Sequence, residues 1–227
     1  KINNENSFDE SLFSFGSSAL KTADPQVRFL IELCYQAMRD GGIRVSDNND
    51  IGLFAGADYF SYVWKGVHYK GNSIDPESYA AKTFLDGSLA SRAAFHLNLA
   101  GPNLTVKGAC ATSLAAIHLA AKSIANGECS MALAGGVNLS WTDGYYPAES
   151  ALSPSGVVRP FSEDADGFVP GDGGGIVILK DYEQSIRDKN HIYSVILGSA
   201  LGGDGNNKIG FTAPSVEGER KTILKAW

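Results

Sequence analysis

The stretch Asn103-Leu104-Thr105-Val106-Lys107-Gly108-Ala109-Cys110-Ala111-Thr112-Ser113 contains the junction that decides how this chain folds. Its first six residues, 103–108, are typical of a short buried strand, and residues 111–126 have the composition and period of a helix. Cys110 is thereby placed at the N-terminus of that helix. Unpaired backbone N–H groups and the positive end of the helix dipole favour a thiolate at such a position. The junction therefore indicates a nucleophilic cysteine.

A cysteine can also be no more than a small buried apolar side chain, and the local pattern leaves both interpretations of Cys110 open. Cys34, on an amphipathic helix, and Cys129, before a strand, fit the second interpretation better. The three cysteines are widely spaced, with no Cys-x-x-Cys pair and no histidine at zinc-ligand spacing. We therefore expect neither a disulfide nor a structural metal.

The rest of the chain predicts an α/β fold. Apolar residues at helical spacing predict helices, and short apolar runs bounded by glycine or polar residues predict strands. Helices are expected at 25–40, 79–97, 111–126, 182–187 and 216–225, and strands at 51–56, 103–108, 131–137, 175–180 and 193–198. Small residues surround most of helix 111–126, which we expect to be enclosed by protein. Strands on both sides of one such helix are typical of α/β proteins.

Composition and charge exclude several classes of protein. The chain has 227 residues, of which 44% are hydrophobic, and a net charge of -6. Without a basic stripe we expect no nucleic-acid partner. No segment reaches the roughly 20 apolar residues of a membrane span, and the polar start 1–6 lacks a signal pattern, so we expect a cytoplasmic protein with no membrane partner. The missing initiator Met and the end at Trp227 inside an expected helix predict that the chain is a fragment.

Two other motifs do not support ligand sites. The glycine cluster 167–175 runs into a strand, whereas a phosphate-binding loop opens a helix, so we interpret it as a tight turn. Asp164, Asp166 and Asp172 miss the spacing of a calcium loop. The long, aromatic and irregular segment 141–168 is instead typical of a functional loop.

None of the four histidines has a recognisable catalytic context. His118 lies eight residues along the helix from Cys110, about 12 Å along its axis and about 80° around it, which excludes it as the partner of the thiol. His96 closes a helix, His68 lies in a polar loop and His191 precedes a strand. We expect structural or solvated roles for these three side chains.

The residues around Cys110 resemble the active-site segment of β-ketoacyl synthases, most closely the ketosynthase domains of modular polyketide synthases. The resemblance is carried by residues 101–106, by Ala109-Cys110 and by residues 113–120. Similar landmarks follow in the family's order at Phe8-Asp9, Asp24-Pro25-Gln26, Ala90-Ser91-Arg92, Gly127-Glu128-Cys129, 134–138, 152–156, Arg159-Pro160-Phe161, 165–168, 171–173 and Thr212-Ala213-Pro214.

The resemblance implies a thiolase-like fold of αβαβα layers. Residues 1–227 would then form a single partial ketosynthase domain, with the N-terminal half at about 1–190 and the start of the C-terminal half at about 191–227. The family is usually homodimeric, and the strand at Leu104–Gly108 matches the one that pairs across its dimer axis. The remaining C-terminal half would be a further partner of this chain.

In this family the cysteine accepts an acyl chain from a phosphopantetheine thioester, and a decarboxylated malonyl-type unit on acyl carrier protein then attacks it in a Claisen condensation. Cys110 matches the nucleophile, and its N–H matches one oxyanion donor. The resemblance implies no cofactor bound by this chain; the substrates are carried on the phosphopantetheine of an acyl carrier protein, which is the expected partner.

The sequence departs from the family at Lys107, Gly108 and Ala111, where an acidic residue, Thr and Ser are usual. By strand alternation Lys107 points away from the thiol. The family's two catalytic histidines belong to its C-terminal half, so we expect that these 227 residues alone cannot condense substrates. The alternatives are a non-condensing homologue, either transacylating only or acting as a chain-length and dimerisation partner, and a fatty-acid condensing enzyme.

Overall fold

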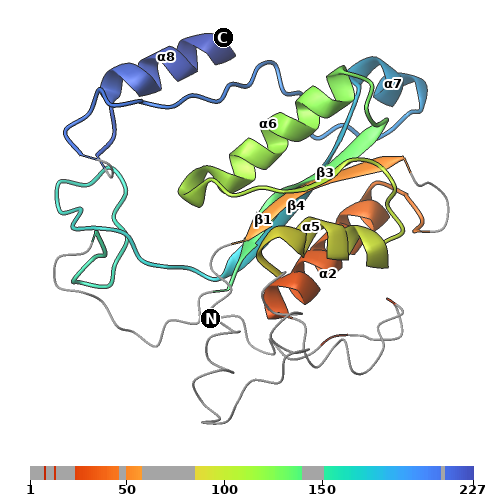
Figure 1. The fold of residues 1–227 in the computed structure, drawn as a ribbon, viewed down its shortest axis with the longest axis horizontal. Helices are drawn as coiled ribbons and strands as arrows, with labels where there is room; N and C mark the ends of the chain where they lie inside the picture. Colours follow the sequence, from red (N-terminus) through yellow and green to blue (C-terminus); the bar gives the residue numbers. More distant parts are fainter. Residues whose placement is uncertain are drawn as a thin grey trace.

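The computed structural model describes residues 8, 13, 24–45, 50–57, 85–139, 151–210 and 213–227, without the side chains of 85–87 (Figure 1). The described elements are α2 (Pro25–Asp40), β1 (Ile51–Ala57), α5 (Leu85–His96), β2 (Asn103–Thr105), the 3-10 turn η2 (Ala109–Ala111), α6 (Thr112–Ala125), β3 (Met131–Asn138), β4 (Gly173–Lys180), α7 (Tyr182–Arg187) and α8 (Val216–Ala226).

One mixed sheet with the strand order β2-β1-β3-β4 organises these elements. β1 pairs in parallel with β2 and with β3, and β3 pairs antiparallel with β4. Figure 1 shows α6 over one face of the sheet and α2 and α5 over the other. The carboxyl ends of the three parallel strands therefore meet at one edge, which is where ligands bind in open α/β sheets.

The two faces of the sheet bury side chains of different size, because successive residues of a strand point to opposite faces. Toward α2 and α5 the strands place large residues in one apolar cluster, among them Ile51, Leu53, Leu133 and Val137. Toward α6 they place mainly alanines, with Ala132 and Ala134 in one cluster with Ala115, Ala116 and Ala120. Phe54 of β1 and Val106 are the larger buried side chains of this cluster, and the alanines of α6 and β3 let the helix backbone lie close to the strands elsewhere.

The predicted helix 25–40 is confirmed as α2, with a polar cap at its start. The buried Asp24 is the N-cap and accepts a hydrogen bond of 2.8 Å from the Gln26 N–H, and Pro25 opens the helix. Among the described residues, the second carboxylate oxygen of Asp24 meets no hydrogen-bond partner. Burial raises the pKa of Asp24 to about 6, although the bonds from Gln26 and the charge of Arg28 lower it.

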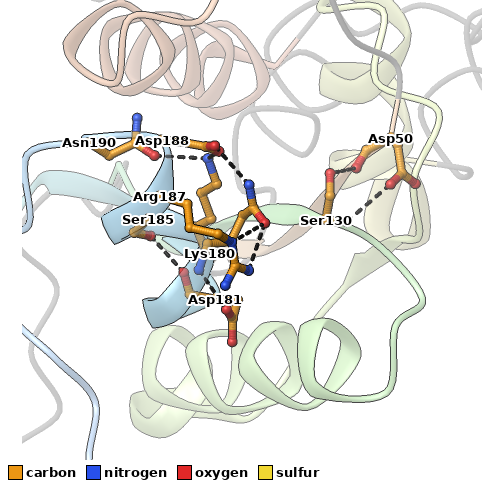
Figure 2. A network of polar contacts seen from close by, with 9 residues as sticks. Asp50, Ser130, Lys180, Asp181, Ser185, Arg187, Asp188 and Asn190 are labelled. Carbon is orange, nitrogen blue, oxygen red and sulfur yellow. Dashed lines mark hydrogen bonds and ion pairs between the residues drawn. The ribbon is translucent and has the colours of Figure 1, made fainter.

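Polar contacts fix the connection from β4 into α7 (Figure 2). Asp181 caps α7 by accepting from the Gln184 N–H at 2.8 Å. Lys180 Nζ donates to Asp188 and, at 2.8 Å, to the side-chain oxygen of Asn190. The bond from Lys180 is the largest cause that lowers the pKa of Asp188. The structure thus confirms the helical turn predicted at 182–187 and shows what holds it to the sheet.

Two predictions about buried elements are wrong. The strand predicted at 103–108 is limited to Asn103–Thr105, and Leu104 is 48% exposed, because β2 is an edge strand with β1 as its one described neighbour. The helix expected to be enclosed has an open face in the described structure, where Leu114 is 70% exposed. Its buried alanines, Ala115, Ala116 and Ala120, face the sheet, and small residues elsewhere on a helix do not require a cover.

The strand predicted at 193–198 is also absent from the described structure. The segment lies on the surface without a strand beside it, and Tyr193 and Leu197 are 77% and 96% exposed. Its β-branched and aromatic residues have strand propensity, but propensity yields a strand only where a partner supplies the hydrogen bonds. The segment is held instead by side-chain contacts, including bonds from the Tyr193 hydroxyl to both carboxylate oxygens of Asp40.

Candidate active site

Cys110 lies where the chain leaves the carboxyl edge of the sheet. After β2 the chain passes through Val106–Gly108, makes the single turn η2 with Cys110 at its centre, and enters α6. This is the strand-to-helix junction predicted from the sequence. Cys110 is exposed, whereas Cys34 and Cys129 are buried. Packing as a small core side chain accounts for those two cysteines and does not account for Cys110.

The residue before the cysteine has an unusual backbone conformation. Ala109 has a φ of +48°, in the left-handed region that costs a non-glycine residue about 1–2 kcal/mol. Backbone strain of this kind persists only where neighbouring groups hold it, and it is concentrated at functional sites. The turn that presents Cys110 is therefore held in place by contacts around it.

Thr112 supplies two of those contacts. Its hydroxyl accepts a hydrogen bond of 2.9 Å from the Gly108 N–H and donates one of 2.7 Å to the Ala109 carbonyl. The Thr112 N–H also donates to the Ala109 carbonyl. No side chain caps the start of α6 at Ala111. The threonine hydroxyl binds back into the preceding turn and restrains it, and it caps none of the N–H groups of α6.

Gly56 near the end of β1 allows α6 to start this close to the sheet. A Cβ atom at Gly56 would collide with the Thr112 methyl group and with the Val106 carbonyl. Val106 in turn donates its N–H to the Ala55 carbonyl at 3.0 Å, which continues the pairing beyond β2. The height of the Cys110 turn above the sheet is consequently set by a glycine.

Thr112 and Gly56 were not singled out by sequence reasoning. A threonine in the first turn of a helix is a recognised signal for side-chain bonding to nearby backbone, and this signal was present. Gly56 offered no such signal, because its importance depends on a close approach between segments far apart in the sequence.

The three residues that differ from those usual in the family surround the cysteine on an exposed surface. Lys107, Gly108 and Ala111 are all exposed, as is Cys110 itself. Ala111 has no side-chain group to donate or accept a hydrogen bond at the start of α6. The Thr112 side chain, one residue further on, binds this turn.

The described histidines have partners of their own. A hydrogen bond of 2.8 Å joins His118 Nδ1 to Ser199 Oγ. His96 Nδ1 lies 3.2 Å from the Phe13 carbonyl oxygen, and burial lowers the pKa of His96. His191 packs edge-on against Tyr193, with the ring centroids 4.5 Å apart. The structural roles expected for His96 and His191 agree with these contacts, and His68 lies outside the described residues.

The loop at 151–168 is organised around Asp166. This carboxylate accepts from Ser153 Oγ at 2.6 Å and from the Ser155 N–H at 3.3 Å, and Arg159 lies 3.8 Å away. The bond from Ser153 is the main cause that lowers the pKa of Asp166. Gly167, with a φ of +141°, closes the loop by packing directly on the backbone of residues 151–153.

Residues 173–175 enter β4 and do not open a helix, as expected for a cluster that is not a phosphate-binding loop. The tight turn predicted across 167–175 is wrong for its last three residues, which belong to the strand. Within the described residues, no group of three or more potential metal ligands gathers at one place. Nor is any helix in that part of the chain both long and apolar enough to cross a membrane.

Fold and site together define an α/β protein that presents an exposed cysteine at the carboxyl edge of its sheet. The family model described as "Beta-ketoacyl synthase, N-terminal domain" matches residues 1–185. A hybrid PKS-NRPS synthetase TAS1 from Gloeophyllum trabeum is 37% identical over 97% of this chain, and the polyketide synthase ThaG from Burkholderia thailandensis is 35% identical over 97%. The chain spans 14% and 4% of these two relatives.

Solved structures show the same relationship. Ketosynthase twelve of the bacillaene polyketide synthase from Bacillus amyloliquefaciens aligns with a TM-score of 0.89 and 30% identity, covering 99% of this chain and 40% of that one. The module 6 ketosynthase of the Bacillus subtilis bacillaene synthase aligns with a TM-score of 0.83 and 32% identity, covering 100% and 39%. The chain belongs to the β-ketoacyl synthase family, a class of condensing transferases, and has the thiolase-like fold of polyketide ketosynthase domains.

Proposed function

We propose that this chain provides the acyl-accepting cysteine of a polyketide ketosynthase. The observation that carries the proposal is the exposed Cys110 on a strained turn at the start of α6, in a chain of the β-ketoacyl synthase family. The Cys110 thiolate attacks the carbonyl carbon of an acyl thioester on phosphopantetheine. A sulfur–carbon bond forms, the donor's carbon–sulfur bond breaks, and the departing thiolate takes up the proton that Cys110 lost.

The second step of the proposal is condensation. A malonyl-type unit on acyl carrier protein loses carbon dioxide, and its carbanion attacks the acyl–Cys110 thioester. A carbon–carbon bond forms, the thioester bond breaks, and the Cys110 thiolate is regenerated. We assign the proton transfers of this step to the two histidines that the family carries in its C-terminal half, and no cofactor of this chain takes part.

The edge position of β2 supports a homodimer through residues 104–108. Among the described strands β2 has β1 on one side only, which leaves one edge of β2 open to strand pairing, and Leu104 at this edge is 48% exposed. In this proposal two copies pair their β2 strands across a two-fold axis. Residues 191–227 begin the C-terminal half, and the complete enzyme acts in the cytoplasm.

A non-condensing homologue is the second candidate, because Lys107, Gly108 and Ala111 differ from the usual residues around the nucleophile. Such a protein would accept an acyl group on Cys110 and transfer it without forming a carbon–carbon bond. A fatty-acid condensing enzyme would share both steps with the first candidate and differ in its substrates.

The test is acyl loading of the full-length protein by an acyl N-acetylcysteamine thioester, read by peptide mass spectrometry. We expect one added acyl group on the peptide that contains Cys110, none in Cys110→Ala, and unchanged loading in the matched control Cys129→Ala. Loading that persists in Cys110→Ala would contradict the assignment of the nucleophile. Malonyl-loaded acyl carrier protein is then added: a β-ketoacyl product supports condensation, and transfer of the unchanged acyl group supports the non-condensing candidate.

A further inference from the structure

We propose that Thr112 is a positioning residue whose hydroxyl aims the Cys110 N–H at the oxyanion of acyl transfer. The inference rests on the proposed function, since it assigns a task within the acylation of Cys110. Thr112 itself is not expected to touch the substrate's reacting atoms. It acts through the backbone of the turn that carries the cysteine.

The hydroxyl of Thr112 bridges both ends of the strained residue. It accepts from the Gly108 N–H at 2.9 Å, on one side of Ala109, and donates to the Ala109 carbonyl at 2.7 Å, on the other. Both bonds are within the normal range for a hydroxyl, and together they use its donor and one of its acceptor positions. The backbone torsions of Gly108 and Ala109 lie between the two bonded groups and are thereby restrained.

The bond to the Ala109 carbonyl also sets the direction of the Cys110 N–H. These two groups belong to the same peptide unit, which is planar and trans, so they point in opposite directions. A hydroxyl that holds the carbonyl toward Thr112 therefore turns the N–H away from it. Within the described part of the chain this N–H meets no hydrogen-bond acceptor, so it is available to an incoming oxyanion.

The peptide unit has reason to turn if the hydroxyl is removed. Ala109 is held at a φ of +48°, and Ala109, Cys110 and Ala111 are all exposed, so little surrounding protein opposes a rotation. The Thr112 methyl group, in contrast, lies against the position where Gly56 lacks a side chain. The methyl group packs the helix onto the sheet, and the hydroxyl orients the peptide, so the two parts of one side chain have separable effects.

Valine and serine separate those two parts. Thr112→Val keeps the branched shape against Gly56 and removes both hydrogen bonds, whereas Thr112→Ser keeps the hydroxyl and removes the methyl group. Thr222→Val on α8 is a matched control, because Thr222 Oγ1 makes the same kind of bond, 2.9 Å to the Gly218 carbonyl, on another helix.

Two reactions of Cys110 distinguish orientation of the N–H from simple exposure of the thiol. Acylation by an N-acetylcysteamine thioester passes through a tetrahedral oxyanion and needs the donor. Alkylation by iodoacetamide displaces iodide at a saturated carbon and forms no oxyanion. Both rates are measured on the full-length protein, at the same pH, on the peptide that contains Cys110.

We expect Thr112→Val to slow acylation by about 10- to 100-fold, less than or equal to the loss of a complete oxyanion donor, while alkylation changes less than about threefold. Thr112→Ser and Thr222→Val should stay within about threefold of the unmodified protein in both reactions. Thr112→Ala, which also lacks the hydroxyl, repeats the test if the valine variant loses its fold.

Three results would overturn the inference: acylation unchanged in the variants without the hydroxyl, equal losses of acylation and alkylation, or a serine variant as slow as valine. The last result would assign the effect to the methyl group. Failure of the proposed function is distinguishable, because the unmodified protein would then not be acylated on Cys110 at all.

Discussion

The two faces of the central sheet differ in the size of the side chains they bury, and this difference separates stability from site geometry. Toward α2 and α5 the core contains fully buried leucines such as Leu30, Leu53 and Leu133. Toward α6 it contains mainly alanines, and Gly56 lies under the first turn of the helix. Large side chains provide most of the apolar burial. Small ones allow α6, the helix that follows the Cys110 turn, to come close to the strands.

The largest expected effect is on the leucine face. Leu53→Ala should lower the free energy of unfolding by about 3 kcal/mol, because it leaves a cavity among fully buried side chains. Urea denaturation measures the loss, and Leu53→Ile, which conserves volume, should lose less than about 1.5 kcal/mol. Protein that remains folded should be acylated at Cys110 at its normal rate. A selective loss of acylation in folded protein would show that the two faces are not separable.

A pH-dependent effect is expected at the start of α2 on the same face. The pKa of Asp24 is about 6 in the folded protein against an ordinary value of 3.8, so the folded state binds this proton more tightly than the unfolded state does. The contribution of Asp24 to the free energy of unfolding should therefore be highest below about pH 4, fall as the pH rises to about 6, and stay level above that. The pKa difference corresponds to a loss of up to about 3 kcal/mol.

Asp24→Asn tests this effect, because asparagine is an equally good helix N-cap and carries no titratable proton. Other carboxylates contribute slopes of their own, so the measured quantity is the difference in unfolding free energy between the two proteins at pH 4 and pH 7. The variant should gain stability relative to the original protein as the pH rises across this interval. A constant difference would contradict the prediction.

On the alanine face, Gly56→Ala should affect the site more than the fold. The added Cβ atom has to displace Val106 or Thr112, which we expect to lower stability by about 1–2 kcal/mol and to slow acylation of Cys110 by about 10-fold or more. Thermal unfolding and acyl loading measure the two effects. Gly42→Ala, in the turn after α2, is a control: Gly42 has open space around it but a left-handed φ of +69°, so the variant should also lose stability and yet leave acylation unchanged. Normal acylation in Gly56→Ala would show that Gly56 does not determine the geometry of the Cys110 turn.

The smallest effect is expected at Ala109. Glycine adopts a φ of +48° without the steric cost that alanine bears, but it also loses more backbone entropy on folding. Ala109→Gly should therefore change the free energy of unfolding by less than about 1 kcal/mol, as measured by urea denaturation. A destabilisation above 2 kcal/mol would show that the Ala109 methyl group has a packing role that its exposed position does not suggest.

Elements that depend on local signals were predicted well from the sequence. Apolar spacing, an Asp-Pro start and a double-glycine end located α2 within a residue, and glycine-bounded apolar runs located β1, β3 and β4 within two. The exposed Cys110 turn was likewise visible as a strand pattern that changes to a helix pattern. The resemblance to ketosynthases, now supported by the family match, fixed the fold around these elements.

Predictions that depended on distant partners were less successful. The segment 193–198 has the composition of a strand, but composition does not reveal whether another strand lies beside it. The small residues of α6 predicted a helix buried on all sides, although its buried alanines lie on the one face that packs against the sheet. The bonds of Thr112 depend on the left-handed backbone of Ala109, and an alanine in the sequence does not indicate that conformation. Gly56 is important only because Thr112 and Val106 approach it.

The short edge strand β2 also bears on the solubility of the protein. An exposed edge is a template on which any extended chain can add a strand, and proteins limit this hazard by keeping edges short or by placing lysine beside them. β2 has three residues, and the exposed Lys107 follows it by two positions. A stray peptide would gain few backbone hydrogen bonds here and meet a positive charge at the end of the ladder. The short length of β2 and the charge of Lys107 therefore limit aggregation at the same edge that we propose for dimerisation.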